Sequence, residues 1–484
     1  MDDELSLKEL LTKGIIVFYV ILSVVESMTR LFKFQRLAYD SPEEVKFGFS
    51  KKPLRYGFDI SVGSGKVVPE IKYFPKPADL KDEKSALLSY KRLTERILMR
   101  AISLGVPSVQ LETELPHIIT LNPKLAGDVT ALQKDILKAY FDEYGVKLAL
   151  RVTVADVRDF SDPDKKEERT NTMLETFEVV SEQGADVISI ESFGGKEVVS
   201  QALIRCDIEG LIFATGVLGS RDVEELWSDI RRSIHGSTLL GGDSACAHAN
   251  SAMVLANGLR RRMIPHIIAS IERVLGAVRT LACFESGAQG PGKDCAYENV
   301  YMKIITGIPV SMEGKSSACA HSSLVGNIVA SICDLWSNES VEDLRLFGGG
   351  APEVFLEILH YDCEVLNTSI KLGFDKTLRE VLIASDKYRD PQGLVLAPEI
   401  AFEIAKTIVS FDSYYERSVE SAKKTCELLK LYKDHLKLPR VEAKYLERVS
   451  KVINEMPNEH KFIDIMVKKY KKLCPSFNPK SYGI

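Results

Sequence analysis

Residues 147–192 read KLALRVTVADVRDFSDPDKKEERTNTMLETFEVVSEQGADVISIES, and this stretch indicates the fold class. It contains two short apolar runs, KLALRVTV (147–154) and DVISIES (186–192), separated by a polar loop and the amphipathic segment NTMLETFEVVSEQGA (171–185). Apolar runs of this length predict buried strands, and the segment between them has helical periodicity. Strands that are separated by helices pair in parallel, with the helices covering the sheet from outside. The stretch therefore predicts a strand–helix–strand unit.

The same alternation extends along the chain in both directions, at a period of about 30–40 residues. Eight segments are predicted as strands: SVQLETE (108–114), KLALRVTV (147–154), DVISIES (186–192), GLIFATGV (210–217), TLLGGDS (238–244), TLACFES (280–286), PVSMEGK (309–315) and LRLFGGG (344–350). A closed (β/α)8 barrel requires eight such units. An open, doubly wound sheet is the alternative, but the unbroken succession favours closure. We therefore predict an α/β protein with a TIM barrel over residues 106–352.

Three further segments are expected outside the barrel. Residues 36–105 are predicted to form an N-terminal hairpin and a helix, and residues 353–484 a C-terminal helical region, because the strand pattern ends near residue 352. Residues 1–35 form an extension whose apolar run, Gly14–Val25, is shorter than the roughly 20 residues that span a bilayer. We interpret the extension as the product of a start codon upstream of Met28. A membrane or partner-binding helix is the alternative.

The composition is ordinary for a soluble globular protein, with 45% hydrophobic and 27% charged residues. The formal net charge of −5 gives no electrostatic reason to expect nucleic acid as a partner. The nine cysteines are scattered and include no C-x-x-C pair, so we expect reduced thiols and a cytoplasmic location rather than a disulfide framework. Such thiols are available as metal ligands.

Reactive side chains follow several of the predicted strands. Glu191 ends the third strand, Cys246 follows the fifth, and Glu285 and Cys295 follow the sixth. In a parallel barrel the carboxyl ends of the strands meet at one rim, which is where active sites form. One carboxylate and two thiolates are ligands that zinc accepts, and a catalytic zinc site combines three protein ligands with an open position. Alternatively, each cysteine is a small buried apolar residue, and Glu191 pairs with a lysine or arginine of the barrel.

Several longer blocks of the sequence resemble one known family. They are SIESFGGKEV (189–198), GGDSACAHANSAM (241–253), GPGKDCAYENVYMKIITGIPVSMEGKSSACAH (290–321), DLWSNESVE (334–342), SDKYRDPQ (385–392) and NPKSYGI (478–484). Their order and spacing, from about Phe34 to the C-terminus, are similar to those of the zinc subunit of methanol:corrinoid methyltransferases, the methanol-cobalamin methyltransferase B subunit family. Two features depart from the family pattern: Val152 stands where a histidine is common, and GAPEVF (350–355) is atypical.

The resemblance implies a TIM barrel whose zinc is held by Glu191, Cys246 and Cys295. It also implies a tight complex with a small corrinoid-carrying protein, assembled as a dimer of heterodimers. The implied reaction is the zinc-dependent transfer of the methyl group of methanol to Co(I) of the partner's corrinoid, in which zinc acts as a Lewis acid. Two alternatives stay open: the same architecture acting on a methylamine, a methyl thiol or an aryl methyl ether, and a non-catalytic scaffold for a corrinoid protein.

The departing oxygen of methanol needs a proton, and several carboxylates on the expected rim could supply it. These are Glu112, Glu114, Asp156, Asp243 and Asp294, among which we favour Glu112 as the catalytic acid. His248 and His321 are candidates for a hydrogen bond to a metal ligand or for a contact with the corrinoid. For each of these residues the alternative is a salt bridge at the rim or a helix cap.

Overall fold

The computed structural model describes residues 33–257, 263–321, 324–339 and 351–484. Phe34–Ile484 form one compact unit, separate from Met1–Lys33. The predicted strand at 344–350 and almost all of the expected extension at 1–35 lie outside the described residues.

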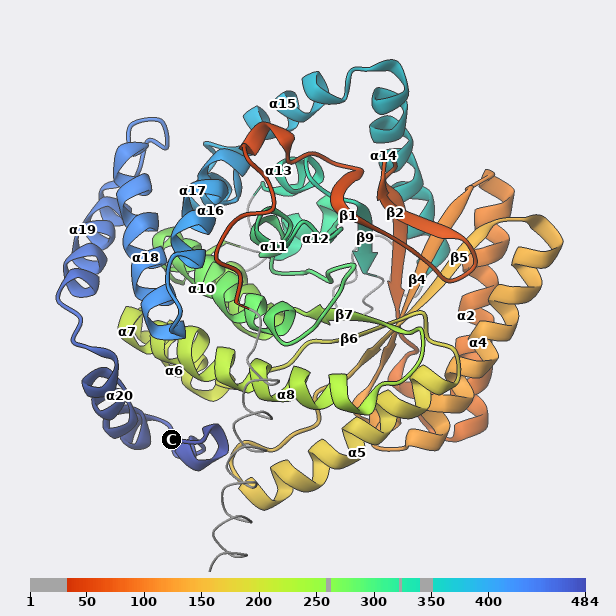
Figure 1. Cartoon of the computed structure of the whole chain (residues 1–484), viewed down its shortest axis with the longest axis horizontal. Coiled ribbons are helices and arrows are strands. Elements are labelled where there is room, and N and C mark those ends of the chain that lie inside the picture. Colours follow the sequence, from red (N-terminus) through yellow and green to blue (C-terminus); the bar gives the residue numbers. More distant parts are fainter. Residues whose placement is uncertain (1–32, 258–262, 322–323, 340–350) are drawn as a thin grey trace, which may run out of the picture. The chain divides into compact units, whose positions relative to one another are not determined.

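A parallel sheet of seven strands forms the centre of the unit Phe34–Ile484 (Figure 1). In chain order its strands are β3 (Val68–Tyr73), β4 (Ser108–Leu115), β5 (Lys147–Val154), β6 (Val187–Ile190), β7 (Leu239–Asp243), β8 (Ser311–Glu313) and β9 (Leu335–Glu339). Their order across the sheet is β7-β6-β5-β4-β3-β9-β8, so the two edge strands are β7 and β8.

An irregular segment connects these two edge strands. The backbone N–H of Gln289 donates to the carbonyl oxygen of Leu240 on β7 at 2.7 Å. On the other side, the N–H of Gly292 donates to the carbonyl oxygen of Pro309, just before β8, at 3.0 Å. Residues 289–292 thus occupy the eighth position and close the ring. The predicted TIM barrel is confirmed, with one position that lacks regular strand geometry.

Helices cover the outside of the barrel. They include α2 (Glu83–Leu104), α4 (Pro123–Tyr144), α5 (Pro163–Glu182), α8 (Ser220–Ser233), α10 (His266–Glu285) and α14 (Pro352–Leu372), which contact one another in the order α14-α2-α4-α5-α8-α10. The first residues of α2, α4 and α5 follow Asp82, Asn122 and Asp162, whose side chains accept hydrogen bonds from the free backbone N–H groups of the first turn. The polar residues of the connecting loops therefore set where these helices begin.

The predicted N-terminal hairpin is confirmed and fills the amino end of the barrel. It consists of the antiparallel strands β1 (Phe49–Tyr56) and β2 (Ile60–Ser64). After β1, the N–H of Phe58 donates to the carbonyl oxygen of Leu148, at the start of β5, at 2.7 Å. Side chains of the hairpin and of the barrel strands form one buried cluster of Tyr56, Ile60, Val62, Val68, Ala149, Val187 and Leu335. We therefore expect the site of the barrel at the opposite end, where the strands finish.

The chain beyond the barrel is helical, as predicted. It contains α15 (Asp375–Asp386), α16 (Pro391–Leu396), α17 (Pro398–Val409), α18 (Tyr414–Leu431), α19 (Arg440–Asn454) and α20 (Glu459–Leu473). Among these, α16 and α18 pack on α10 of the barrel (Figure 1). Across the described ranges, no helix has the length and apolar character needed to cross a membrane.

Two of the predicted strands are helices, so these predictions were wrong. Residues 210–217 lie in α7 (Ile208–Leu211) and the π-helix Ile212–Gly219, and residues 280–286 lie at the end of α10. Every residue of α10 is buried, because α10 lies between the barrel and the C-terminal helices. A short apolar run in such a helix has the same pattern as a buried strand.

The strand β3 is not among the predicted strands, although all six of its residues are buried. Pro69, Glu70 and Lys72 interrupt its apolar pattern. Inside the barrel, however, Glu70 pairs with Arg151 of β5 at 2.7 Å, so charged residues can occupy these interior positions. Because β3 pairs with β4 and β9, the barrel sheet begins within residues 36–105 rather than at residue 106.

Candidate metal centre

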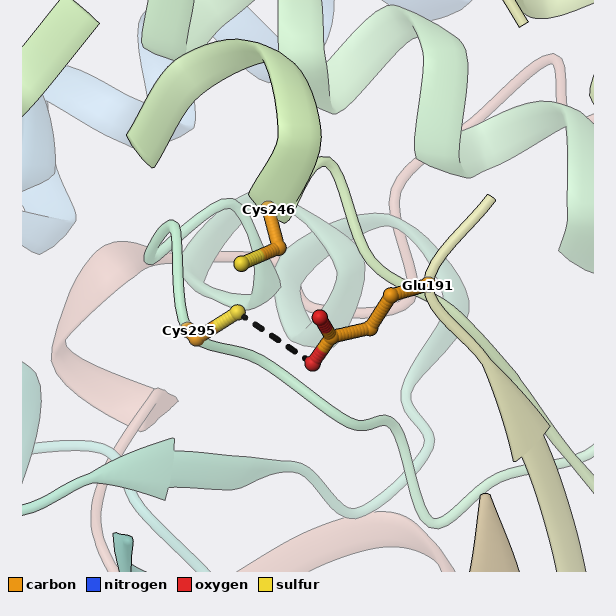
Figure 2. A group of neighbouring side chains, drawn as sticks. All are labelled: Glu191, Cys246 and Cys295. Carbon is orange, nitrogen blue, oxygen red and sulfur yellow. Dashed lines mark hydrogen bonds between the residues drawn. The ribbon is translucent and has the colours of Figure 1, made fainter. Parts of the chain in front are cut away.

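Three side chains from three loops at the carboxyl end of the barrel point toward one another (Figure 2). Glu191 directly follows β6, Cys246 opens the π-helical turn Cys246–Asn250 after β7, and Cys295 follows residues 289–292. Their ligand atoms all lie within 4.8 Å of one another, and Cys295 Sγ is 3.6 Å from Glu191 Oε1. The structure therefore brings together the three residues that the sequence singled out as metal ligands.

The spacing and the chemistry of this donor set fit a zinc ion. Zn–S distances of about 2.3 Å and Zn–O distances of about 2.0 Å in a tetrahedron separate neighbouring ligand atoms by roughly 3.5–3.8 Å. The 3.6 Å between Cys295 Sγ and Glu191 Oε1 falls in that range. Burial, with a contribution from Cys246, raises the pKa of the Cys295 thiol well above its ordinary value. Thiolate ligation would therefore require the bound cation to displace the thiol protons.

The turn that carries Cys246 is held by hydrogen bonds at both ends. At its start, Glu298 Oε1 accepts from the backbone N–H of Ala245 at 2.6 Å. At its end, Asn250 Nδ2 donates to Cys246 Sγ at 3.5 Å. Short π-helical turns are rare and occur frequently at functional sites. The turn thus presents the Cys246 sulfur in a fixed direction.

Asp294 fixes the loop that carries Cys295. Its Oδ1 accepts from the backbone N–H groups of Ala296 and Tyr297 at 2.8 and 2.6 Å, and its Oδ2 accepts from that of Asn299 at 2.7 Å. The carboxyl group is buried, and burial together with Glu298 raises its pKa well above the usual value. Asp294 therefore caps its own loop, which was the alternative to a role as catalytic acid.

Two other predicted rim acids fix the loop that carries Glu191. Asp243 accepts from the Ser192 backbone N–H at 3.1 Å and from the Ser192 hydroxyl at 2.6 Å. Asp156 Oδ2 accepts from the Phe193 backbone N–H at 3.1 Å and also pairs with Arg158. Both carboxylates are buried. Their contacts place Ser192 and Phe193, and with them Glu191.

Two buried lysines that sequence reasoning missed contact Glu191. Lys72 Nζ, from β3, and Lys293 Nζ each lie 3.1 Å from Glu191 Oε1. Burial alone would raise the pKa of Glu191, but the two ammonium groups outweigh it and hold the pKa below its usual value. Lys72 was missed together with its strand. Lys293 stands two residues before Cys295, and this proximity was the signal that could have identified it.

Glu112 and Glu114, from β4, complete this charged cluster. Glu112 is buried, forms an ion pair with Lys293 and accepts from the Thr153 hydroxyl at 2.7 Å. Against the effect of burial, Lys293 holds the pKa of Glu112 below its usual value. Glu114 Oε1 lies 2.8 Å from Lys72 Nζ. Lys293 therefore bridges Glu112 and the metal ligand Glu191.

A cleft of about 310 Å³ leads from the surface to Glu191. Its walls include Phe74, Glu114, Asp156 and Phe193, which follow or end the strands β3 to β6. The cleft thus opens at the carboxyl end of the barrel and combines aromatic side chains with carboxylates. Its size admits a small organic substrate beside Glu191, which is the one ligand residue that lines the cleft.

The remaining predicted polar residues have other partners. His248 Nε2 lies 2.9 Å from the carbonyl oxygen of Gly194, and His321 Nδ1 lies 3.6 Å from Glu313 Oε2. Glu285 is at the end of α10 and pairs with Arg417 of α18 at 2.8 Å, both side chains being fully buried. Glu285 therefore ties the barrel to the C-terminal helices.

Comparisons with known proteins agree with this arrangement. The family described as methanol-cobalamin methyltransferase B subunit matches residues 31–483. The chain is 40% identical over 456 residues to the methanol--corrinoid protein co-methyltransferase of Methanosarcina barkeri (strain Fusaro / DSM 804), covering 93% of this chain and 99% of the relative. It also superimposes on a chain of the solved methanol:cobalamin methyltransferase complex MtaBC from Methanosarcina barkeri, with a TM-score of 0.87 and 38% identity, covering 93% of this chain and all of that one. The chain belongs to the methanol-cobalamin methyltransferase B subunit family.

Proposed function

We propose that this chain is a methyltransferase that transfers the methyl group of methanol to Co(I) of a corrinoid bound to a partner protein, with zinc at the centre formed by Glu191, Cys246 and Cys295. The observation that carries the proposal is the convergence of these three ligands at the carboxyl end of a barrel. The relative and the solved complex described above carry the names of this reaction.

Methanol is a poor methyl donor because hydroxide is a poor leaving group. Zinc would act as a Lewis acid that polarises the methanol oxygen and so makes it easier to displace. Glu191, Cys246 and Cys295 would hold the ion with one carboxylate and two thiolates. Lys72 and Lys293 fix the Glu191 carboxylate and add positive charge beside these anionic ligands. These charges would act strongly on a bound methanol only where water is excluded, because water screens electrostatic interactions.

The cleft supports a small methyl donor. Phe74 and Phe193 contribute aromatic walls, and Glu114 and Asp156 contribute oxygens that can accept a hydroxyl proton. A corrinoid protein docked over the carboxyl end of the barrel would exclude water from this cleft. The cobalt nucleophile would then arrive from the partner, while this chain holds and orients the electrophile.

We further propose that the proton for the leaving oxygen comes from the pair of Glu112 and Lys293, with the Lys293 ammonium group as the member that carries the proton. The support is geometric: Glu112 forms an ion pair with Lys293, and Lys293 Nζ is 3.1 Å from Glu191 Oε1. Lys293 thus contacts both Glu112, the carboxylate that the sequence favours as acid, and the metal ligand Glu191. Glu112 and Lys293 would have to act as a pair, because Lys293 holds the pKa of Glu112 below its usual value and the carboxylate alone carries no proton to give.

We also propose a dimer of heterodimers with the corrinoid protein, in the cytoplasm. The partner is supported by the solved MtaBC complex, whose matching chain is covered completely. The compartment is supported by eight of the nine cysteines, which are free thiols in the structure. Sedimentation of the co-purified proteins tests the stoichiometry.

The proposed function is tested by methylation of the partner's corrinoid. The chain is purified together with its corrinoid protein, and the cobalt is reduced to Co(I). Methanol is then added, and conversion to methyl-Co(III) is followed by absorbance. Methylamine, methanethiol and an aryl methyl ether are added in parallel. Conversion with methanol alone supports the proposal. Conversion with another donor alone identifies a different methyltransferase, and no conversion with zinc bound indicates a scaffold.

A further inference from the structure

The end of the chain contacts the loop that carries Glu191. Tyr482, in the short 3-10 helix Pro479–Tyr482, accepts a hydrogen bond from the backbone N–H of Gly195 at 2.7 Å through its hydroxyl oxygen. The same hydroxyl donates to Glu197 Oε1, in the first turn of α6 (Lys196–Arg205), at 2.8 Å. Gly195 and Tyr482 are 287 residues apart in sequence, so the contact joins the C-terminal region to the metal-binding loop.

Aromatic rings extend this contact to the wall of the cleft. The ring of Tyr482 stacks on Phe160 with centroids 5.3 Å apart and an interplanar angle of 15°. Phe160 in turn meets the edge of Phe193, with centroids 5.5 Å apart and an angle of 67°. Phe193 lines the cleft beside Glu191. Tyr482 therefore supports the loop through its hydroxyl and, through Phe160, the side chain of Phe193.

The segment that presents Tyr482 is itself fixed to the barrel. Lys166 Nζ, from α5, donates to the carbonyl oxygen of Ser481 at 2.7 Å. The hydroxyl of Ser481 donates to the carbonyl oxygen of Phe160 at 2.9 Å. Only 5% of the surface of Tyr482 is exposed. The tyrosine is thus a rigid support rather than a loose end of the chain.

The loop at residues 191–195 depends on such supports. Ser192, Phe193 and Gly194 are held by Asp243, Asp156 and His248. Gly195 is buried and has a φ of +88°, and a Cβ atom there would lie 2.7 Å from the carbonyl oxygen of Ala214. Without the Tyr482 hydroxyl, the buried N–H of Gly195 would lose its partner, which a buried backbone donor tolerates poorly.

We propose that Tyr482 is a positioning residue of the metal centre. It holds the loop 191–195 from outside the barrel, so that Glu191 stays within reach of Cys246 and Cys295 and Phe193 keeps its place in the cleft wall. This inference rests on the proposed metal centre and deepens it. It gives the C-terminal block NPKSYGI (478–484) a role in metal affinity.

The test compares Tyr482→Phe with wild type and with Tyr470→Phe. Tyr482→Phe keeps the ring on Phe160 and removes the hydroxyl. Tyr470 lies in α20 near the same end of the chain, and its hydroxyl donates to Asp207 at 2.7 Å, away from the loop 191–195. Zinc affinity is measured on the purified chain by competition with a chromophoric chelator, and the geometry of the site is followed by the thiolate-to-metal absorption of the Co(II)-substituted chain.

We expect Tyr482→Phe to lower zinc affinity about tenfold, as removal of an outer support of a metal ligand does, and to shift the Co(II) absorption. Tyr470→Phe should lose similar stability while leaving both readouts at the wild-type values. If Tyr482→Phe is insoluble, Glu197→Gln replaces it. Its amide oxygen still accepts a hydrogen bond from the Tyr482 hydroxyl, but a weaker one than the carboxylate does, so zinc affinity should fall only about threefold.

Equal zinc affinity and equal Co(II) spectra in wild type and the Tyr482 or Glu197 variant would overturn this inference alone. A wild-type chain that binds no stoichiometric zinc would overturn both the inference and the proposed function. Because the readouts use this chain without its partner, failure of methyl transfer from methanol would contradict only the proposed function.

Discussion

His248 Nε2 donates a hydrogen bond to the carbonyl oxygen of Gly194 at 2.9 Å and so ties the turn that carries Cys246 to the loop that carries Glu191. The ring is buried, and burial, with Arg279 and Lys196 nearby, lowers the pKa of His248 well below its usual value. The imidazole is therefore neutral, and its one proton lies on the nitrogen that faces Gly194. The His248 side chain thus connects the segments that carry two of the ligands, Cys246 and Glu191.

This connection predicts the effect of His248→Ala. The variant should bind zinc about tenfold more weakly, because outer partners that orient metal ligands contribute on that scale. Chelator competition measures the affinity. His266→Ala is the matched control, since His266 Nδ1 also has a buried hydrogen-bonding partner, Gln392 Nε2 at 2.9 Å, at the far end of α10. An equal loss of zinc affinity in both variants would show that His248 acts only through general stability.

Removal of a ligand thiol should have a larger effect. Cys246→Ala and Cys295→Ala are expected to lose most bound zinc and nearly all methyl transfer, because two protein ligands do not hold a catalytic zinc ion tightly. The barrel should stay folded, since neither thiol lies in a strand of the barrel. Elemental analysis and circular dichroism measure these outcomes. Cys426→Ala, which removes a buried thiol of α18, is the control. Stoichiometric zinc in the double variant Cys246→Ala/Cys295→Ala contradicts the assignment.

How much of this site the sequence could predict depended on the kind of residue. Glu191, Cys246 and Cys295 follow strands or lie in small-residue loops, and they converge in the structure because parallel strands end at one rim. The predicted convergence is correct, although one of the strands on which it was based is a helix. Cys295 was predicted to follow a strand at 280–286, whereas it follows the irregular segment 289–292, which takes the place of that strand in the ring.

The lysines beside Glu191 could not be predicted in the same way. Lys72 lies in the buried strand β3, where it pairs with Glu114 and Glu191. Local sequence shows a lysine in a stretch with broken apolar periodicity, which resembles a surface loop. Only the packing of β3 between β4 and β9 makes that position interior. Long-range ion pairs of this kind leave no local pattern.

The position of Lys72 leads to a prediction about stability. Its side chain is 3% exposed and contacts Glu114 and Glu191, which are 20% and 25% exposed. Lys72→Met should destabilise the zinc-free chain by about 2–3 kcal/mol, because Glu114 and Glu191 then have only Lys293 to compensate two largely buried charges. Zinc should restore part of the loss, since the cation takes over the compensation of Glu191. Thermal unfolding with and without zinc measures both effects.

Lys138→Met is the control for this measurement. Lys138 pairs with Asp142 on the exposed face of α4, with side chains 61% and 56% exposed, and such surface pairs contribute little to stability. Its unfolding midpoint should match wild type in either condition. A Lys72→Met chain that gains no more from zinc than wild type does would contradict the role of Lys72 beside Glu191.

Glu272 predicts a pH dependence that is independent of the metal ligands. This carboxyl of α10 is fully buried and accepts a hydrogen bond from the Thr215 hydroxyl. Burial raises its pKa from 4.5 to about 8, although Thr215, Lys196 and Arg279 act in the opposite direction. Between these two values the folded chain keeps a proton that the unfolded chain releases. Because the folded state binds more protons in this window, its stability must fall as the pH rises through the window and level off above about 8.

Glu272→Gln isolates this contribution, because glutamine keeps an oxygen for Thr215 and does not titrate. Relative to wild type, the variant should gain stability progressively from pH 5 to pH 8, by an amount on the order of 3 kcal/mol at the upper end. Denaturant unfolding of both chains at several pH values measures the difference, from which all other titrating groups cancel. A difference that stays constant across the range would mean that Glu272 is already charged in the folded chain at pH 5. In that case Lys196, whose pKa burial lowers, would have to carry the compensating charge.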